Sequence, residues 1–389
     1  MEALHERRTA SEAVLHWDFP VGEHTLYCMI TPAIVELLET AYQAELSVRR
    51  QWQRLPAGAQ SHYLRSLLLD EVVATNDIEG VFSTRREIQE ALDSATPNHR
   101  FKEFARLYDA LAHGETRLPD TLEGIRSLYE KVMDGEKLPD DDQLDGELFR
   151  DGSVTVWDSR RQRVVHSGFH PEHKLQEGLR TILRITDREN TPSLITAFIA
   201  HLMFEVVHPF YDGNGRTGRY LLGAHIAEIL SPATALTLST AINTQKDRYY
   251  QAFMAVEDPV NRAEATPFVV TMLRFLTEAQ QTLTQDVDAR LYLMKSLADE
   301  TRALQNNLPT DWKALHADIM HFLGELHLFG ADRAATYADV AQHMKRSTSQ
   351  TRKDLQLLRE QGYLDTVTER PVRLRLSDSG LDVLGLRMY

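Results

Sequence analysis

The sequence predicts a mainly α-helical protein with one short β-hairpin and a C-terminal helix-turn-helix domain. Apolar residues recur at three- and four-residue intervals through most of the 389 residues, which is typical of helices. Residues 150–170 alternate apolar and polar side chains instead. From about residue 331 the pattern of apolar residues changes again, to that of two short helices followed by a hairpin. The 42% hydrophobic and 26% charged residues are ordinary for a globular protein, so a buried core is expected.

Bulk composition narrows the protein class. No run of about 18 apolar residues occurs, and the N-terminus lacks the apolar core of a signal peptide, so we expect a cytoplasmic protein with no membrane partner. Cys28 is the single cysteine, which excludes an internal disulfide and a cysteine-based zinc site. The net charge of −14 argues against nucleic-acid binding by the molecule as a whole.

Residues 1–100 are expected to form a helical N-terminal region. Within it, a helix over about 62–80 is predicted to stop at Gly80, because glycine tolerates the left-handed conformation that ends helices. Ser83 or Thr84 could then cap a following helix, with Glu87 in its first turn.

Residues 101–290 form the expected core. Its helical pattern of apolar residues is interrupted by a hairpin over about 150–168, where Val154 and Val156 alternate with Ser153 and Thr155. This is the one β segment that we expect before the C-terminal domain. The turn of the hairpin contains three arginines: Arg160, Arg161 and Arg163. They could contact an acidic surface of a target protein, or they could simply be solvated.

Residues 291–330 are interpreted as a helical linker and 331–389 as a winged helix-turn-helix domain. Ser347 or Thr348 is a candidate cap of the second helix, Gly362 its stop, and a hairpin follows. Residues 343–376 contain eight Lys or Arg against four acidic residues, so 337–376 could bind DNA. Winged helices also serve protein contacts, and homodimerisation therefore stays open.

Residues 208–219, HPFYDGNGRTGR, combine an imidazole, a carboxylate, three glycines and two arginines directly after an apolar helical run. Pro209 ends that helix, so His208 lies where the helix stops. The glycines allow a turn whose N–H groups converge on an anion, and a second helix begins there with its positive end. The pattern G-x-G-x-x-G is also present, but a helix precedes it and residues 236–239 contain no carboxylate, which argues against a dinucleotide-binding turn.

This stretch resembles the signature HPFx[D/E]GNGRxxR of the Fic (filamentation induced by cAMP) family, with every fixed position present. The similarity extends over roughly residues 60–280 and implies a helical Fic core. The hairpin lies where the family has a flap that pairs with an extended target segment, which implies docking along Val164, Val165 and His166. The run LSTAINTQKDRYYQAF is similar to a later family helix and implies nucleotide contacts by Tyr249 and Tyr250.

The resemblance implies transfer of AMP from ATP to a Ser, Thr or Tyr hydroxyl of a protein. His208 would be the general base, because an imidazole with a pKa of about 6.5 can accept the hydroxyl proton. Asp212 would hold Mg²⁺. The other implied residues bind the nucleotide phosphates, through backbone N–H groups, the Asn side chain or planar guanidinium groups: Gly213, Asn214, Gly215, Arg216, Gly218 and Arg219.

The segment Thr75-x-x-x-Glu79-Gly80 resembles the family's inhibitory helix motif, [S/T]xxxE[G/N]. Glu79 could form an ion pair with Arg219 and occupy the guanidinium that should bind the γ-phosphate. It could instead position a water that removes AMP from a target, or be a solvated carboxylate at a helix end. We therefore expect an autoinhibited protein adenylyltransferase whose unknown target could include itself. The alternative is a DNA-binding transcriptional regulator whose Fic core senses a nucleotide.

Overall fold

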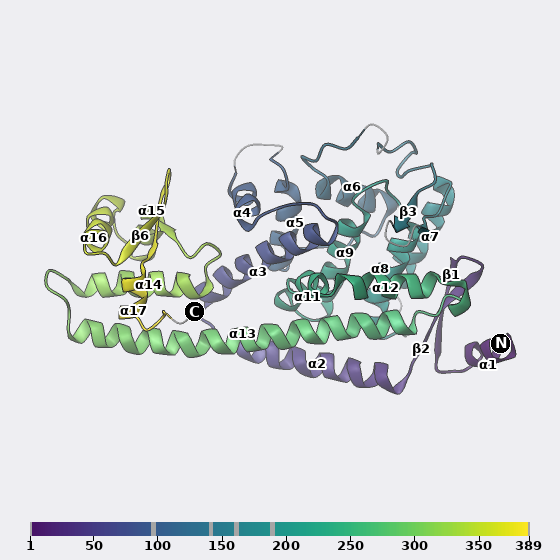
Figure 1. The fold of residues 1–389 in the computed structure, drawn as a ribbon, viewed down its shortest axis with the longest axis horizontal. Coiled ribbons are helices and arrows are strands. Elements are labelled where there is room, and N and C mark those ends of the chain that lie inside the picture. Colours follow the sequence, from purple (N-terminus) through teal and green to yellow (C-terminus); the bar gives the residue numbers. More distant parts are fainter. Residues whose placement is uncertain (1, 95–98, 140–142, 159–162, 187–190, 388–389) are drawn as a thin grey trace. The chain divides into compact units, whose positions relative to one another are not determined.

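The computed structural model describes residues 2–94, 99–139, 143–158, 163–186 and 191–387 (Figure 1). The chain divides into two compact units, Met1–Val48 with Leu67–Thr282 and Arg49–Ser66 with Leu283–Tyr389. Three long helices belong partly to each unit, namely α2 (Pro32–Trp52), α3 (Ala57–Ile78) and α13 (Thr266–Asn306). The division thus falls at other residues than the domain boundaries expected near 100, 290 and 330, which remain predictions.

Helix α8 (Ser193–Val207) forms the centre of the first unit. All its residues except Ser193 are buried or, for Glu205, largely buried, because a helix that is apolar on every side must be covered on every side. It packs against α7 and α9 (Figure 1). The helices of this unit besides α2, α3, α8 and α13 are α1 (Glu2–Thr9), α4 (Arg85–Asp93), α5 (Lys102–Ala112), α6 (Leu122–Val132), α7 (Glu172–Ile185), α9 (Asn214–Ile229), α10 (Pro232–Ala235), α11 (Leu238–Thr244), α12 (Lys246–Glu257) and a 3₁₀ turn (Pro259–Asn261).

A hairpin near the N-terminus contradicts one expectation. Strands β1 (Val14–Val21) and β2 (His24–Met29) pair antiparallel, so the hairpin at 150–170 is not the one β segment before the C-terminal domain, while most of residues 1–100 are helical as expected. The sequence contains the signal: Trp17 and Phe19 are buried on one face while their neighbours are exposed. Gly22 makes the turn at φ 60°, a conformation that glycine adopts without strain.

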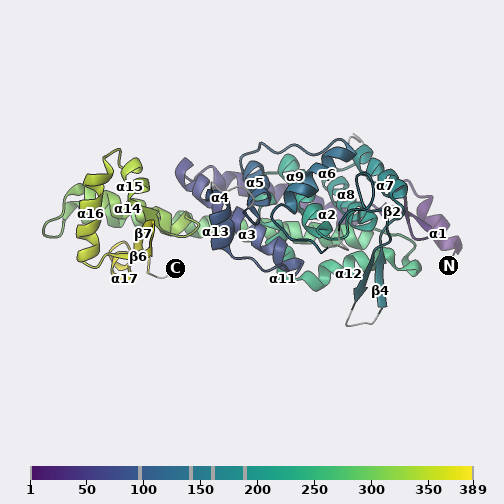
Figure 2. The same cartoon turned by 90° about the horizontal axis from the view of Figure 1, so that it is seen from above.

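The expected hairpin in the core is present. Strands β3 (Thr155–Asp158) and β4 (Arg163–Ser167) pair antiparallel, with a register shift between Val156 and Trp157. Figure 2 shows the two strands projecting from the helices of the first unit. Arg160 and Arg161, expected at the basic turn, lie outside the described residues.

The end of α3 follows the sequence expectation closely. The helix stops at Ile78, and Gly80 adopts φ 72° directly after it. Thr84 is the cap of α4, because its Oγ1 accepts a hydrogen bond from the backbone N–H of Glu87. Ser83 does not cap the helix; its hydroxyl accepts from Asn76 Nδ2 at 3.0 Å and so ties the loop back to α3.

The second unit continues α13 into α14 (Ala314–Phe329) and then a helix-turn-helix-hairpin sequence. Ser347 caps its second helix and Gly362 at φ 84° ends it. The three strands form an antiparallel sheet in the order β5-β7-β6. Among the described residues, no helix combines the length and the apolar character that crossing a bilayer requires. The elements are β5 (Ala335–Thr336), α15 (Tyr337–His343), α16 (Thr348–Glu360), β6 (Leu364–Glu369), β7 (Val372–Leu376) and α17 (Asp378–Val383).

Candidate active site

His208 occupies the point where α8 stops. Its backbone is left-handed, at φ 51° and ψ 62°, and its N–H still donates to the Phe204 carbonyl at 2.9 Å. This conformation is unfavourable for a residue other than glycine, and Pro209 adds its own restriction on the residue before it. The imidazole Nδ1 lies 3.3 Å from the Glu205 carbonyl oxygen. Because a carbonyl can only accept, Nδ1 carries the proton, and Nε2 is the nitrogen with basic character.

The turn between α8 and α9 is held from inside by Asn214. Its amide oxygen accepts from the Phe210 N–H at 2.9 Å and its amide nitrogen donates to the Phe210 carbonyl at 2.7 Å. The expected contact of this side chain with a phosphate therefore has a competitor, and the backbone N–H remains the group available to an anion. Gly213 adopts φ 79° at the start of α9, where the first N–H groups of a helix have no acceptor within it.

Arg216 lies inside the protein beside Glu136, and phosphate binding by this residue stays a prediction. Its side chain is 2% exposed, and Nη1 is 3.1 Å from Glu136 Oε1. Nη2 lies 3.9 Å from Asp212 Oδ2. Asp212 itself is 56% exposed, and its Oδ1 accepts from the Gly213 N–H at 2.6 Å. The structure thus places one arginine of the signature behind the exposed carboxylate, where it orients that carboxylate electrostatically.

Arg219 is held by the end of α3 through all three of its nitrogens. Nη1 lies 2.7 Å from Glu79 Oε1, Nε donates to Thr75 Oγ1 at 2.7 Å, and Nη2 donates to the Thr75 carbonyl at 2.9 Å. The arginine side chain is 2% exposed and that of Glu79 31%. The pairing that the sequence suggested between residues 79 and 219 is present, and Thr75 is an additional partner.

The Glu79 carboxylate also lies against the first turn of α9. A Cβ added at Gly215 would overlap Glu79 Oε1 and would come within 3.0 Å of Arg219 Nη1. An anion at this position interacts favourably with the positive end of the helix. Glu79 therefore occupies the kind of position that a phosphate group would take, and glycine at 215 is what leaves room for it.

Further hydrogen bonds hold the end of α3 in place. Tyr250 donates through its hydroxyl to the Ile78 carbonyl at 2.9 Å, and Asn243 Nδ2 donates to Asp77 Oδ2 at 2.8 Å. Both partners come from the region of α11 and α12, so the segment around residues 77–79 is anchored to the core next to Glu79. Tyr250, which the family resemblance implied as a nucleotide contact, is engaged with this segment.

Tyr249 belongs to a buried cluster behind Arg219. It is 2% exposed, and its hydroxyl lies 2.7 Å from His201 Nε2. Burial and the positive charge of Arg219 lower the pKa of His201 to about 3. Burial and the negative charge of Glu79 raise the pKa of Glu205 to about 8. Glu205 was missed by sequence reasoning, although its place three residues before His208 on the same helix could have indicated it.

In the hairpin, the backbone of strands β3 and β4 is described, and the side chains of residues 156–166 are not. Val164 and His166 lie on β4 opposite Trp157 and Val156, and Val165 falls at the register shift between them. The side chains of these three predicted docking residues lie outside the described residues, so docking there remains a prediction.

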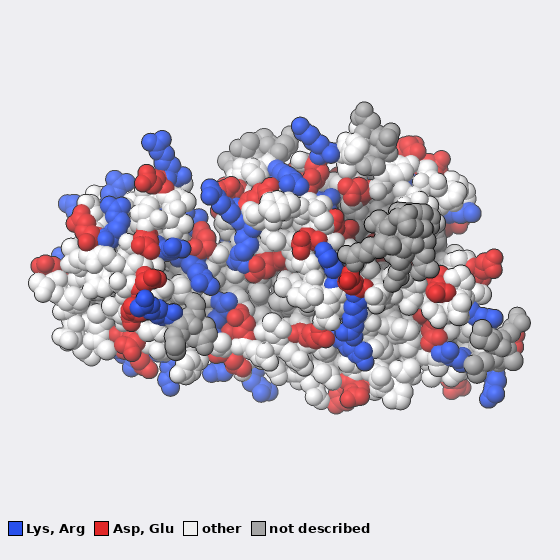
Figure 3. Space-filling view, in the orientation of Figure 1, with Lys and Arg blue, Asp and Glu red and all other residues white. Residues whose placement is uncertain are grey.

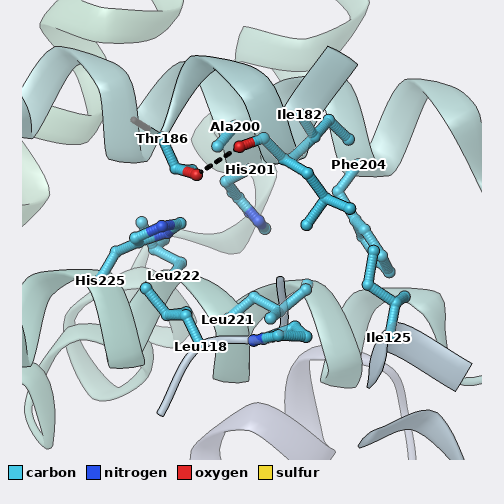
Figure 4. A pocket seen from close by; sticks show the side chains of 13 residues that line it. Leu118, Ile125, Ile182, Thr186, Ala200, His201, Phe204, Leu221, Leu222 and His225 are labelled. Atoms are coloured by element: carbon cyan, nitrogen blue, oxygen red, sulfur yellow. Dashed lines mark hydrogen bonds between the residues drawn. The ribbon is translucent and has the colours of Figure 1, made fainter. Parts of the chain in front are cut away.

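A small cavity of about 40 Å³ lies next to residues 208–219 (Figure 4). The rings of His201 and His225 point into it among apolar side chains. Gly218 is the one residue of the 208–219 stretch in its lining. Pockets for drug-sized ligands have volumes of about 300–1,000 Å³, so this cavity is too small for a nucleotide.

Comparison with known proteins agrees with this geometry. Residues 119–225 match the model of the Fic/DOC family. A probable protein adenylyltransferase of Aquifex aeolicus (strain VF5) is 42% identical over 59 residues, which are 15% of this chain and only 18% of that protein. The crystal structure of a Fic family protein from Desulfovibrio desulfuricans G20 has a TM-score of 0.53 at 21% identity, covering 90% of this chain and 97% of that one.

A Fic domain containing signaling protein from Bacteroides thetaiotaomicron VPI-5482 has a TM-score of 0.45 at 14% identity, covering 66% of this chain and 95% of that one. The fold likeness to the Desulfovibrio protein includes the region of the family match, and the complete signature lies within that region. Residues 119–225 of this chain therefore form a Fic/DOC domain.

Proposed function

We propose that this protein is an autoinhibited protein adenylyltransferase, which transfers AMP from ATP to a hydroxyl group of a protein. The observation that carries the proposal is the position of Glu79, on Arg219 and against the first turn of α9. The groups that attract a carboxylate here, a guanidinium and the N-terminal end of a helix, are also the groups that would bind phosphate oxygens. The family match and the name of the Aquifex relative support the same activity.

His208 is the proposed base. Its Nδ1 donates to the Glu205 carbonyl, which leaves Nε2 to accept the proton of the incoming hydroxyl. The target oxygen forms a bond to the α-phosphorus of ATP, the bond from that phosphorus to the bridging oxygen breaks, and pyrophosphate leaves. This transfer needs no covalent enzyme intermediate, so the base and the phosphate contacts are sufficient.

The donor set suits Mg²⁺ bound mainly through the substrate. Asp212 presents one exposed carboxylate, and among the described residues no group of three or more His, Cys, Asp or Glu side chains could hold a metal ion. Mg²⁺ in nucleotide sites is held by one or two carboxylates together with phosphate oxygens and water. When bound, it would offset negative charge on the phosphates. Asp212 would orient it, and the backbone of Gly213 and Gly215 would bind the phosphates beside it.

Autoinhibition follows from competition for one guanidinium. Glu79 and Thr75 contact all three nitrogens of Arg219, and Glu79 offsets its positive charge, so the guanidinium would bind a γ-phosphate less strongly. ATP would then bind without its outer phosphate clamped, and the α-phosphorus would not be aligned with the target hydroxyl. Withdrawal of Glu79 would free Nη1 while Thr75 keeps the rest of the guanidinium in place.

The test is incorporation of label from α-labelled ATP in the presence of Mg²⁺. The Glu79→Gly variant should label itself or proteins of a cell lysate far more strongly than the wild type. The double variant Glu79→Gly, His208→Ala should lose this labelling and still bind ATP. Equal labelling of wild type and Glu79→Gly would contradict the brake, and labelling by the double variant would contradict the base. Mass spectrometry of the labelled proteins would identify the modified residue.

The opposite direction, removal of AMP from a modified protein, uses the same groups. Glu79 is 31% exposed and lies at the phosphate position, so it could orient a water there. Incubation of a purified AMP-modified target with wild type and with Glu79→Gly separates the two directions. A wild type that releases AMP, and a variant that does not, would assign Glu79 to removal.

We also propose that 331–389 is a winged helix that binds DNA. One contact on α16 favours this over a purely protein-binding surface. Asp354, which would repel DNA, lies 3.2 Å from both His316 and Arg346 and is half-buried. The neighbouring Arg352 and Lys353 are exposed. On the face seen in Figure 3, basic and acidic groups are interspersed, so a contact would depend on α16 and not on a broad basic surface.

A gel-shift measurement with short duplex DNA tests this second candidate. Binding by wild type that falls at least tenfold in Arg352→Ala, Lys353→Ala would support it. Unchanged binding in that variant, or no shift by wild type at low salt, would assign the domain to protein contacts.

A further inference from the structure

Arg150 is a fully buried arginine whose contacts converge on the proposed base. It is 0% exposed. Nε donates to the His208 carbonyl at 2.8 Å, and Nη2 donates to the Val207 carbonyl at 3.3 Å. Nη1 donates to the Gly152 carbonyl. Among the described residues, no carboxylate lies within ion-pair distance of this guanidinium, so its described partners are carbonyl oxygens.

Burying a guanidinium without a carboxylate partner is energetically unfavourable, and the carbonyl groups around Arg150 offset this penalty. Val207 and His208 are the last residues at the C-terminal end of α8, where carbonyl groups lack partners in the helix and carry partial negative charge. A lysine has three donors on a single nitrogen and lacks the fixed spacing of a guanidinium fork. The planar guanidinium donates to the carbonyls of the two peptide groups that flank the left-handed Cα of His208.

The same guanidinium lies at the base of the flap. A Cβ added at Gly168, the residue after β4, would overlap Arg150 Nη2 and would come within 3.0 Å of His208 Cβ. Backbone hydrogen bonds join the same segments: the Phe169 N–H donates to the Val207 carbonyl at 3.1 Å, and the Arg150 N–H donates to the Pro209 carbonyl at 3.2 Å. Both ends of the hairpin are thus attached to the backbone around His208.

From this arrangement we infer that Arg150 is a positioning residue, which holds the left-handed backbone of His208 and the base of the flap at one fixed separation. The inference rests on the proposed transfer reaction, in which the flap presents a target and His208 takes its proton. The base and the target would be held by different segments of the chain, and the Arg150 side chain contacts both of these segments. Misplacement of a reacting group by about 1 Å can cost about 100-fold in rate.

The experiment uses Glu79→Gly as the active background and adds Arg150→Lys, which keeps the charge but loses the fork. Gly168→Ala is the second variant, because it leaves Arg150 in the chain and places a methyl group where Nη2 lies. Arg126→Lys is the matched control: Arg126 donates to the Leu148 carbonyl at 2.8 Å in the same loop but does not contact His208. We expect kcat for AMP transfer to fall about 100-fold in both variants and less than threefold in the control.

Two readouts separate positioning from simple structural support. The Kd for ATP should stay within about threefold of the background, because the phosphate contacts come from α9 and not from Arg150. The ¹⁵N signals of the His208 ring should show one tautomer in the background and a mixture in Arg150→Lys, as the bond from Nδ1 to the Glu205 carbonyl loosens.

The inference is overturned by unchanged kcat in folded Arg150→Lys and Gly168→Ala, or by failure of both to fold, which would make Arg150 a stability element. The NMR readout needs no enzymatic activity. If Glu79→Gly transfers no AMP, the proposed function fails, and the tautomer of His208 still decides whether Arg150 positions it.

Discussion

Arg219 Nη1 and Glu79 Oε1 lie 2.7 Å apart, although 140 residues separate them in the chain and they come from different helical segments. The arginine is buried and the glutamate is partly exposed, so the glutamate is the partner that can leave. The end of α3 around it is held by hydrogen bonds to Tyr250 and Asn243. Under the proposed autoinhibition, activation would require movement of one carboxylate and no unfolding of the helix.

Nucleotide preference should change when Glu79 is removed. In the wild type, ATP and ADP should bind with similar affinity, since Arg219 is occupied and the γ-phosphate gains no contact from it. In Glu79→Gly, ATP should bind about tenfold more tightly than ADP, the effect of one charge-assisted hydrogen bond. Isothermal titration calorimetry with each nucleotide measures this. Asp77→Asn, two residues before Glu79, keeps an oxygen for Asn243; it is the control and should behave as wild type.

Thr75 should contribute to the brake independently of the carboxylate. Thr75→Val keeps the shape but removes the acceptor of Arg219 Nε, so the guanidinium is held less firmly at α3. Labelling from α-labelled ATP should rise about tenfold over wild type and stay below that of Glu79→Gly. Thr75→Ser retains the hydroxyl and should match wild type. A Thr75→Val protein as inactive as wild type would limit the brake to Glu79.

Asp212 should set the Mg²⁺ requirement. In the Glu79→Gly background, Asp212→Asn keeps an oxygen for the Gly213 N–H and loses the negative charge. The Mg²⁺ concentration for half-maximal transfer should increase about tenfold or more, and excess EDTA should abolish transfer in both proteins. Thermal stability should change little, because the side chain is 56% exposed. Identical Mg²⁺ titrations would remove Asp212 from the metal site.

Glu205 should make stability depend on pH. Its pKa is raised from 4.5 to about 8, first by burial and then by Glu79. The folded protein retains a proton that the unfolded chain releases, so this contribution is present below about pH 4.5 and is lost as pH rises to about 8. Glu205→Gln stays neutral at every pH. The fall in Tm between pH 5 and pH 8 should therefore be smaller by about 2–4 °C in this variant.

The control for this measurement is Glu90→Gln, which alters an exposed glutamate on α4 that pairs with Arg86. Its Tm profile should run parallel to that of wild type between pH 5 and pH 8. Parallel profiles for Glu205→Gln and wild type as well would show that Glu205 does not titrate in this range.

Much of the fold was predictable because local signals and packing agree. Gly80, Thr84, Ser347 and Gly362 end or cap helices where glycine or hydroxyl residues satisfy the backbone. The N-terminal hairpin was missed because its alternation is short and the surrounding region reads as helix. Its burial against the rest of the first unit, not local propensity, makes it a pair of strands.

In the candidate site, the sequence indicated which residues are present but not which residues their side chains contact. Arg216 was expected on the outer phosphates and lies against Glu136, 80 residues earlier in the chain. Asn214 was expected to reach a phosphate with its side chain, and that side chain holds the turn at Phe210. Such partners depend on which elements pack together, and one sequence carries no direct signal for contacts at these separations.

By itself, the sequence determined the chemistry of residues 208–219, the stop of α8 at His208 and the presence of a carboxylate near the end of α3, because proline, glycine and helical periodicity act locally. Only the tertiary structure decided that Thr75 and Glu79 together occupy Arg219, and that Arg150 joins the backbone of His208 to the base of the flap. These contacts join residues 58 to 144 positions apart. They form because burial of α8 brings the surrounding segments together around its C-terminal end.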